Sequence, residues 1–441
     1  MDLLKDKLSK VYFKFLLTAF GSALITSIYG VVDMIVVGKY HGPNGSAAMA
    51  VIAPIWNIIY SLGLLVGIGG SVLFSVQKGK KEEGNNPNQF FSSSIIFGII
   101  IAIVSWVAIV IFEVPLLRLF GADDTLMPLC RSYFKAVKVS VPVYIFTQIM
   151  AAFLRNDGDP ILATLAVIFG GVFNIFGDYF FTFTCDLGIE GAGIATALGA
   201  TASLLVMMIH FFKKSNTLRF SFKKSYFCHF LLIAKSGFST FIIDIAMGVL
   251  TILMNQRIMK YLNSDALAVY GVLINISTFA QCSAYGVGQA AQPILSQNYG
   301  AKQMDRVKKL LLYNVYSCLV ISVIFVTSVM VFPNGFIHLF MTPTESVLSI
   351  APNTMRIYAL AFIFLPFNVY STYYFQAILR TKTSIIISLA RGIFISGLLI
   401  LVLPFILSSD SIWYAIPISE LITTIIVVFC VLKKEKVKTN G

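Results

Sequence analysis

Apolar stretches long enough to cross a lipid bilayer recur along the whole chain. A membrane-spanning helix needs about 20 consecutive, mainly apolar residues. The sequence is 57% hydrophobic and only 12% charged, whereas soluble domains are about 25% charged. The pattern predicts an all-α, polytopic membrane protein that crosses the bilayer about twelve times. The spans are predicted at about 11–38, 47–77, 90–112, 133–155, 160–183, 190–212, 229–258, 266–298, 309–333, 352–379, 384–407 and 411–432.

The placement of the basic residues predicts the orientation of the chain. The net charge of +13 is carried mainly by Lys and Arg at both ends of the sequence and in alternate gaps between spans. Cytoplasmic loops carry an excess of these residues, so both termini are expected in the cytoplasm of a cell with this protein in its plasma membrane. Because topology accounts for the charge, no nucleic-acid partner is expected. The polar start, residues 1–14, has no cleavage site and is interpreted as a lead-in to the first span.

The second half of the sequence resembles the first. Residues 46–51 (SAAMAV) are similar to residues 264–269 (SDALAV), and a Leu-Arg pair ends both the fourth and the tenth predicted span. Each half holds six spans, so both point the same way across the membrane. We therefore expect two pseudo-symmetric six-helix bundles, at 1–215 and 216–441, joined by a basic cytoplasmic linker at about 213–228. Repeats of this kind favour a site between the bundles and rocking of one against the other.

Four carboxylates lie well inside predicted spans: Asp33, Asp178, Asp244 and Glu420. Ionisable residues inside a bilayer are costly and usually functional, and none of the four has a Lys or Arg at helical spacing. Asn174 precedes Asp178 by one turn, so both side chains share a helix face. An amide oxygen beside a carboxylate suits a sodium ion and equally a protonatable acid. Hydrogen bonding between helices is the alternative.

Three motifs, in this order along the chain, resemble the multidrug and toxic compound extrusion family. The first is Tyr29-Gly-Val-Val-Asp33, followed by Val-Val-Gly at 36–38. The second is the Asn174…Asp178 pair with GIEGAGIAT at 188–196, and the third is GVGQAAQP at 286–293 running into NYGAK at 298–302. The resemblance covers essentially the whole chain. It implies two bundles of six helices arranged as a V around a central cavity.

The resemblance also implies a function. Members of this family are secondary transporters that export small amphiphilic, mostly cationic drugs or metabolites by alternating access, coupled to protons or sodium. The implied coupling site in the N-terminal bundle is Asp33, Asn174, Asp178 and Thr196, with sodium at the first three as the only metal expected. No enzymatic activity and no cofactor are implied, and the expected partners are a small-molecule substrate and membrane lipid around a monomer. Further candidate site residues are Tyr29, Asp244 and Glu420.

The chain departs from the family pattern in two places. The family often has a proline about four turns before the first-helix Asp, whereas residues 11–38 contain none, and Thr18 occupies that region with Gly21 nearby. One branch of the family also uses acids on the seventh and tenth helices. Here Asp244 comes about one turn early, and residues 357–379 contain no acid. A coupling site in the C-terminal bundle is therefore not expected.

Two other functions remain open at this stage. A flippase for lipid-linked glycans would need a strongly cationic cavity, but the cations inside predicted spans are few. An integral-membrane enzyme would need a cluster of His, Cys or acidic residues, but the four histidines are scattered and the six cysteines show no metal-binding spacing. Amide and aromatic residues are candidates for the substrate cavity, with ordinary packing as the alternative: Asn57, Tyr60, Gln148, Gln281, Tyr285, Asn368, Tyr373 and Gln376.

Overall fold

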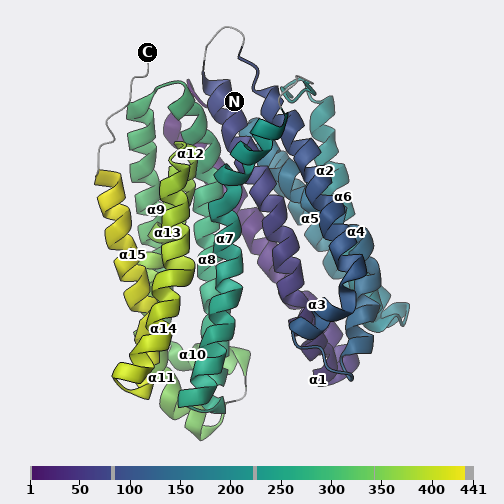
Figure 1. Cartoon of the computed structure of the whole chain (residues 1–441), viewed down its shortest axis with the longest axis vertical. Helices are drawn as coiled ribbons and strands as arrows, with labels where there is room; N and C mark the ends of the chain where they lie inside the picture. The colour runs from purple at the N-terminus through teal and green to yellow at the C-terminus, as the bar shows by residue number, and fades with distance from the viewer. Residues whose placement is uncertain (1, 81–84, 222–225, 342, 433–441) are drawn as a thin grey trace. The chain divides into compact units, whose positions relative to one another are not determined.

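The computed structural model describes residues 2–80, 85–221, 226–341 and 343–432, which include part of the predicted linker but not residues 222–225 or the basic tail at 433–441. These residues are almost entirely helical (Figure 1). The helices of the first half are α1 (Leu8–Gly79), α2 (Asn88–Ile111), α3 (Glu113–Leu119), α4 (Met127–Asn156), α5 (Pro160–Tyr179), η1 (Phe180–Thr184), α6 (Gly188–Met208) and η2 (Ile209–Phe212). Those of the second half are α7 (Tyr226–Tyr261), α8 (Ser264–Gly300), α9 (Met304–Val331), α10 (Pro333–Phe340), α11 (Glu345–Ala359), α12 (Ala361–Ala377), α13 (Thr381–Leu389), η3 (Ala390–Phe394), α14 (Ile395–Ile406), η4 (Ser409–Tyr414) and α15 (Ala415–Leu432).

The described helices confirm the predicted fold class. Ten of them, or eleven with the bent α4, are long and apolar enough to cross a membrane. α1 has 72 residues and contains both of the first two predicted spans. The two spans meet at Gly42, whose backbone is not helical (φ 64°, ψ −150°). Glycine adopts this conformation at little cost because it has no Cβ, so the connection between the two spans is a sharp break and not a separate loop.

The chain divides into two compact units, which are described separately. The first unit comprises residues 1–245, 289–310 and 376–379. In it α1, α2, α4, α5 and α6 pack against one another (Figure 1). α5 and α6 approach closely at two glycines: a Cβ at Gly170 would lie 1.9 Å from Ser203 Oγ, and a Cβ at Gly199 would lie 2.9 Å from Asn174 Cβ. Small residues let membrane helices pack backbone to backbone, and here they bring Asn174 against α6.

The first unit also takes in α7 as far as Ile245 and α8 from Gln289 onward. A Cβ at Gly237 on α7 would lie 1.9 Å from the carbonyl oxygen of Leu65 on α1, and Ser75 Oγ donates to the carbonyl of Pro293 on α8 at 3.3 Å. These contacts explain why the unit does not end at the predicted bundle boundary near residue 215. The division into bundles at 1–215 and 216–441 stays a prediction.

A buried ionic network lies where α1, the α4–α5 turn and η2 meet. His210, whose side chain is fully buried, lies between Asp157 (Nε2–Oδ2 2.8 Å) and Asp159 (Nδ1–Oδ2 3.1 Å). Lys78 Nζ lies 2.5 Å from Asp157, and Lys213 Nζ lies 2.7 Å from Asp159. Both ring nitrogens of His210 therefore face carboxylates and must both donate, which describes an imidazolium ion. The spacing of residues along the chain does not indicate that this histidine has partners.

The network holds the start of the predicted linker against the rest of the first unit. The backbone N–H of Thr217 donates to Asp157 Oδ2 at 2.8 Å. Asn88 Nδ2 at the start of α2 donates to the carbonyl of Thr217 at 3.0 Å, and Ser221 N–H donates to Ser92 Oγ at 2.8 Å.

Burial alone would raise the pKa of Asp159, but its hydrogen bond from His210 and the Lys213 ammonium outweigh burial and lower that pKa to about 2.

The second unit comprises residues 246–288, 311–375 and 380–441. α11 packs against α10 and α15, and α14 packs against α15. Its interior holds an ion pair between Arg391 on η3 and Glu420 on α15, with Nε and Oε1 2.7 Å apart. Asn368 on α12 donates to the other oxygen of Glu420 at 2.6 Å. Three helices are thereby tied together at one buried carboxylate.

Candidate functional site

Four polar side chains converge inside the first unit from three helices. Asp33 comes from α1, Asn174 and Asp178 come from α5, and Thr196 comes from α6; all four are buried, and Asp178 is fully buried. Asn174 Nδ2 lies 3.3 Å from Asp178 Oδ1 and 3.4 Å from Thr196 Oγ1. Thr196 Oγ1 lies 3.3 Å from Asp33 Oδ2 and 3.0 Å from the carbonyl of Ala192. The structure thus brings together the four residues that the motifs indicated, here called the N-terminal cluster.

Within the part of the chain that the structure describes, the N-terminal cluster has no counter-charge. No Lys, Arg or His of the described residues forms an ion pair with Asp33 or Asp178. The two carboxyl groups are connected through Thr196, which is hydrogen-bonded to Asp33, and Asn174, which is hydrogen-bonded to Asp178 and Thr196. Two carboxyl groups in one buried cluster cannot both be ionised cheaply. The geometry therefore describes an uncompensated pair of acids.

Three oxygens of the N-terminal cluster lack a hydrogen-bond donor among the described residues. They are Asp33 Oδ1, Asn174 Oδ1 and Asp178 Oδ2, all of them buried. Buried polar atoms are nearly always paired in native structures, so each exception asks for an explanation. Oxygens of carboxylates and amides are the ligands that hard cations prefer. The residues present fit either a sodium ion or further protons. A site built from three or more His, Cys, Asp or Glu side chains is a different kind of metal site, and the described residues contain none.

A layer of aromatic hydroxyls and an indole surrounds the N-terminal cluster. Tyr133 on α4 is buried, and its hydroxyl lies 3.3 Å from Thr196 Oγ1. Trp56 Nε1 donates to that hydroxyl at 3.2 Å. Tyr29, a candidate from the sequence, pairs instead with Tyr144 on α4 through hydroxyls 2.9 Å apart. Sequence reasoning missed Tyr133; its signal was a tyrosine inside an apolar span, whose hydroxyl needs a partner when buried.

The two further acidic candidates lie in different surroundings. Asp244 is half-buried and accepts a hydrogen bond from Ser61 Oγ at 3.4 Å. Glu420 is buried and neutralised by Arg391. The sequence could not predict the pairing of Arg391 with Glu420, because these residues lie on different helices 29 positions apart. Neither acid is linked to the N-terminal cluster by a hydrogen bond of the described residues.

Most of the predicted cavity residues are engaged in packing within their own unit. Asn57 is exposed, and Tyr60 and Gln148 are half-buried. Gln376 donates to the carbonyl of Ser236 at 2.8 Å, and Gln281 donates to the hydroxyl of Tyr285 at 2.6 Å. The rings of Tyr285 and Tyr373 lie 6.1 Å apart, and Asn368 is bonded to Glu420. Their role in a substrate cavity stays a prediction.

Thr18 stands in the region of α1 where the family often has a proline. Its hydroxyl donates back to the carbonyls of Lys14 and Phe15, at 3.0 and 2.9 Å. Its own carbonyl accepts a hydrogen bond from Thr164 Oγ1 on α5 at 2.8 Å. Threonine hydroxyls that bond back to the preceding turn bend helices slightly. A hydrogen bond between α1 and α5 therefore lies in the region where the family often has a proline.

Known proteins are similar to this chain in both sequence and fold. The MatE family model matches residues 19–180 and 239–402. The multidrug export protein MepA of Staphylococcus saprophyticus is 27% identical over 316 residues, which are 71% of this chain and 69% of that protein. MepA of Staphylococcus aureus strain NCTC 8325 is 25% identical over 356 residues, 80% of this chain and 78% of that protein.

Solved structures of transporters have the same fold. An outward-facing multidrug resistance MATE transporter superimposes with a TM-score of 0.88 at 20% identity, over 97% of this chain and 96% of that chain. A MATE structure in a bent conformation gives 0.87 at 20% identity, over 97% and 95% of the two chains. The family model and the curated relatives give the class of protein, a multi-pass membrane transporter, which is not an enzyme. The chain belongs to the MatE family.

Proposed function

We propose that this protein is a secondary antiporter that exports small amphiphilic cations, coupled to protons or sodium at the N-terminal cluster. The observation that carries the proposal is the buried, uncompensated pair of Asp33 and Asp178 with three oxygens that lack a donor. A buried charge without a partner is expensive. Binding of a proton or a sodium ion removes that cost, so the ion occupancy of the cluster controls its stability.

Alternating access follows from differential binding. A ligand shifts a conformational equilibrium only as far as its affinities for the two states differ. The N-terminal cluster joins α1, α5 and α6, so a movement of α1 changes the distance between Asp33 and the other three residues. The ion would bind tightly where the helices are together and weakly where they separate. Substrate export would then draw on the ion gradient.

Three cations inside predicted spans have carboxylate partners, which favours a cationic substrate over an anionic one. Lys135 is paired with Glu190 and Lys138 with Glu113, at 2.9 and 2.6 Å. Arg391 is paired with Glu420. A flippase for lipid-linked glycans needs unpaired cations to receive phosphate, and these three have carboxylate partners. The similar MepA proteins, which carry the name multidrug export protein, support the export of small molecules.

Transport in proteoliposomes tests the proposal. Purified protein is reconstituted, and uptake of a panel of cationic dyes is followed under an imposed proton gradient or an imposed sodium gradient, each outward-directed. The gradient that drives uptake identifies the coupling ion. Uptake of an anionic lipid-linked glycan, with no dye transport under either gradient, would replace this function with the flippase.

A further inference from the structure

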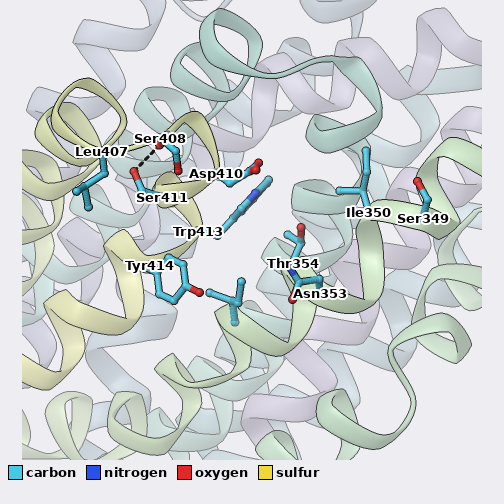
Figure 2. A pocket seen from close by; sticks show the side chains of 11 residues that line it. Ser349, Ile350, Asn353, Thr354, Leu407, Ser408, Asp410, Ser411, Trp413 and Tyr414 are labelled. Carbon is cyan, nitrogen blue, oxygen red and sulfur yellow. Dashed lines mark hydrogen bonds between the residues drawn. The ribbon is translucent and has the colours of Figure 1, made fainter.

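A cavity of about 530 Å³ lies within the second unit, between α11 and η4. Figure 2 shows side chains of both segments turned toward it. Ligand pockets for small molecules measure about 300–1,000 Å³, so the space suits a drug-sized molecule. The charge pattern predicts that this end of the unit faces the extracellular side. The cavity contains no residue of the N-terminal cluster.

The walls of this cavity, here called the α11–η4 pocket, are aromatic and apolar with hydroxyl groups between them. Trp413 is only 2% exposed, and its ring lies 6.4 Å from that of Tyr270 on α8, which fixes its position. Tyr414 is 42% exposed beside it, and Ile350 on α11 lines the facing wall. Thr354 is a buried hydroxyl residue of the same wall. An aromatic floor that is already fixed binds apolar bodies with little ordering cost.

The α11–η4 pocket carries one charge, and the charge is negative. Asp410 is exposed at the pocket and makes no hydrogen bond or ion pair with another described residue. Figure 2 shows its carboxylate beside the Trp413 ring. The lining residues include no Lys, Arg or His. An anion such as phosphate would therefore find no counter-charge here, whereas a cation would find a free carboxylate.

We propose that the α11–η4 pocket is a second ligand site that binds an organic cation with an apolar body. The Asp410 carboxylate would attract the cationic centre, and the exposed ring of Tyr414 would hold it by cation–π contact. The apolar body would lie against Ile350. Two sources share this chemistry: a free amphiphilic cation, or the amine of a lipid headgroup. The site does not depend on coupling at the N-terminal cluster.

Thiol protection in the purified full-length protein tests the site. A Ser408→Cys substitution places a thiol on the exposed rim of the pocket, and the parent protein measured in parallel accounts for the native cysteines. Tetraphenylphosphonium should slow modification of the introduced thiol by a small methanethiosulfonate reagent. Adding Asp410→Asn should raise the half-protecting concentration by about tenfold, as expected for the loss of one favourable charge interaction. Asp265→Asn removes an acid that does not line the pocket and should leave that concentration unchanged.

Tetraphenylborate, which has the same shape and the opposite charge, should not protect the thiol. Equal protection by tetraphenylborate would overturn the proposal, and so would the same half-protecting concentration in the Asp410→Asn and Asp265→Asn proteins, or no protection by the phosphonium. A second arm identifies the source of the ligand. Protection in nanodiscs of phosphatidylethanolamine without phosphonium, lost in phosphatidylglycerol and in Asp410→Asn, would assign the pocket to a lipid amine. Protection by the phosphonium alone would assign it to free cations.

Discussion

Two regions of the molecule bury carboxylates among membrane helices and treat the charge in opposite ways. In the second unit, Glu420 meets Arg391 at 2.7 Å and Asn368 at 2.6 Å, so its charge is neutralised and both oxygens are bonded. In the first unit, Asp33 and Asp178 have no cationic partner among the described residues. A neutralised carboxylate is a structural tie, whereas an uncompensated one must take up an ion or a proton to become stable.

Because of this contrast, substitutions at Glu420 should affect stability, whereas substitutions at Asp33 and Asp178 should affect ion coupling. Removing one partner of a buried ion pair leaves the other charge alone and is strongly destabilising. Removing a charge from an uncompensated pair relieves repulsion and leaves packing intact. Substitutions in the two regions should therefore fail in different assays, one in unfolding and the other in gradient-driven transport.

The largest effect on stability is expected from Glu420→Gln. The substitution leaves the Arg391 guanidinium buried without its carboxylate, at a cost of about 3–5 kcal/mol. The midpoint of thermal unfolding in detergent measures this loss. The double variant Arg391→Met/Glu420→Gln should recover much of the stability because no buried charge is left. If Glu420→Gln unfolds at the same temperature as the parent, the ion pair is not a structural tie.

The next effect is on coupling and compares Asn174→Ala with Asp244→Asn. Asn174 bridges Asp178 and Thr196, so its loss leaves the carboxylate without its amide partner, and ion-dependent transport should disappear. Asp244 lies outside the N-terminal cluster, so Asp244→Asn should keep most ion-dependent transport. Both variants are compared in the same vesicles under the same gradient. Loss in Asp244→Asn together with activity in Asn174→Ala would move the coupling site out of the N-terminal cluster.

A smaller effect is expected from Gly199→Ala, which tests the packing that positions the N-terminal cluster. The added methyl would lie 2.9 Å from Asn174 Cβ and 2.7 Å from the carbonyl of Gly170, so α5 and α6 must separate. Overpacking of this kind costs about 1–3 kcal/mol, and coupling should weaken with it. Gly248→Ala on α7 is the control, because its methyl would meet open space. Equal unfolding temperatures and coupling in the two variants would show that the close approach is unimportant.

The last effect concerns Asp159 and depends on pH. Its pKa of about 2 lies below the value of about 3.9 in an unfolded chain. A lowered pKa stabilises the folded state above the unfolded pKa, and this stabilisation is lost as pH falls from about 4 toward 2. At neutral pH, Asp159→Asn should therefore cost about 2 kcal/mol. The difference in unfolding temperature between parent and variant should shrink below pH 4. A difference that stays constant down to pH 2 would show that the ionised Asp159 carboxylate does not stabilise the folded state.

The sequence was sufficient to predict the membrane spans but not the partners of the buried charged residues. Hydropathy located the apolar spans that the described helices contain, because the length of an apolar run does not depend on packing. Motif spacing brought Asp33, Asn174, Asp178 and Thr196 together as candidates, and their role stays a prediction. The rotation of one helix against another is not encoded in local spacing. The pairing of Glu420 with a distant Arg391, and the burial of His210 between two acids, were therefore missed.

Gradient-driven transport by Asp33→Asn and Asp178→Asn proteins tests the central claim most directly. An asparagine resembles the protonated acid in shape but cannot release or rebind an ion. In proteoliposomes with an outward-directed proton or sodium gradient, dye uptake by either variant should fall to the level without a gradient, while the unfolding temperature stays at or above that of the parent. Full gradient-driven uptake in either variant would contradict the assignment of the coupling ion to the Asp33–Asp178 pair.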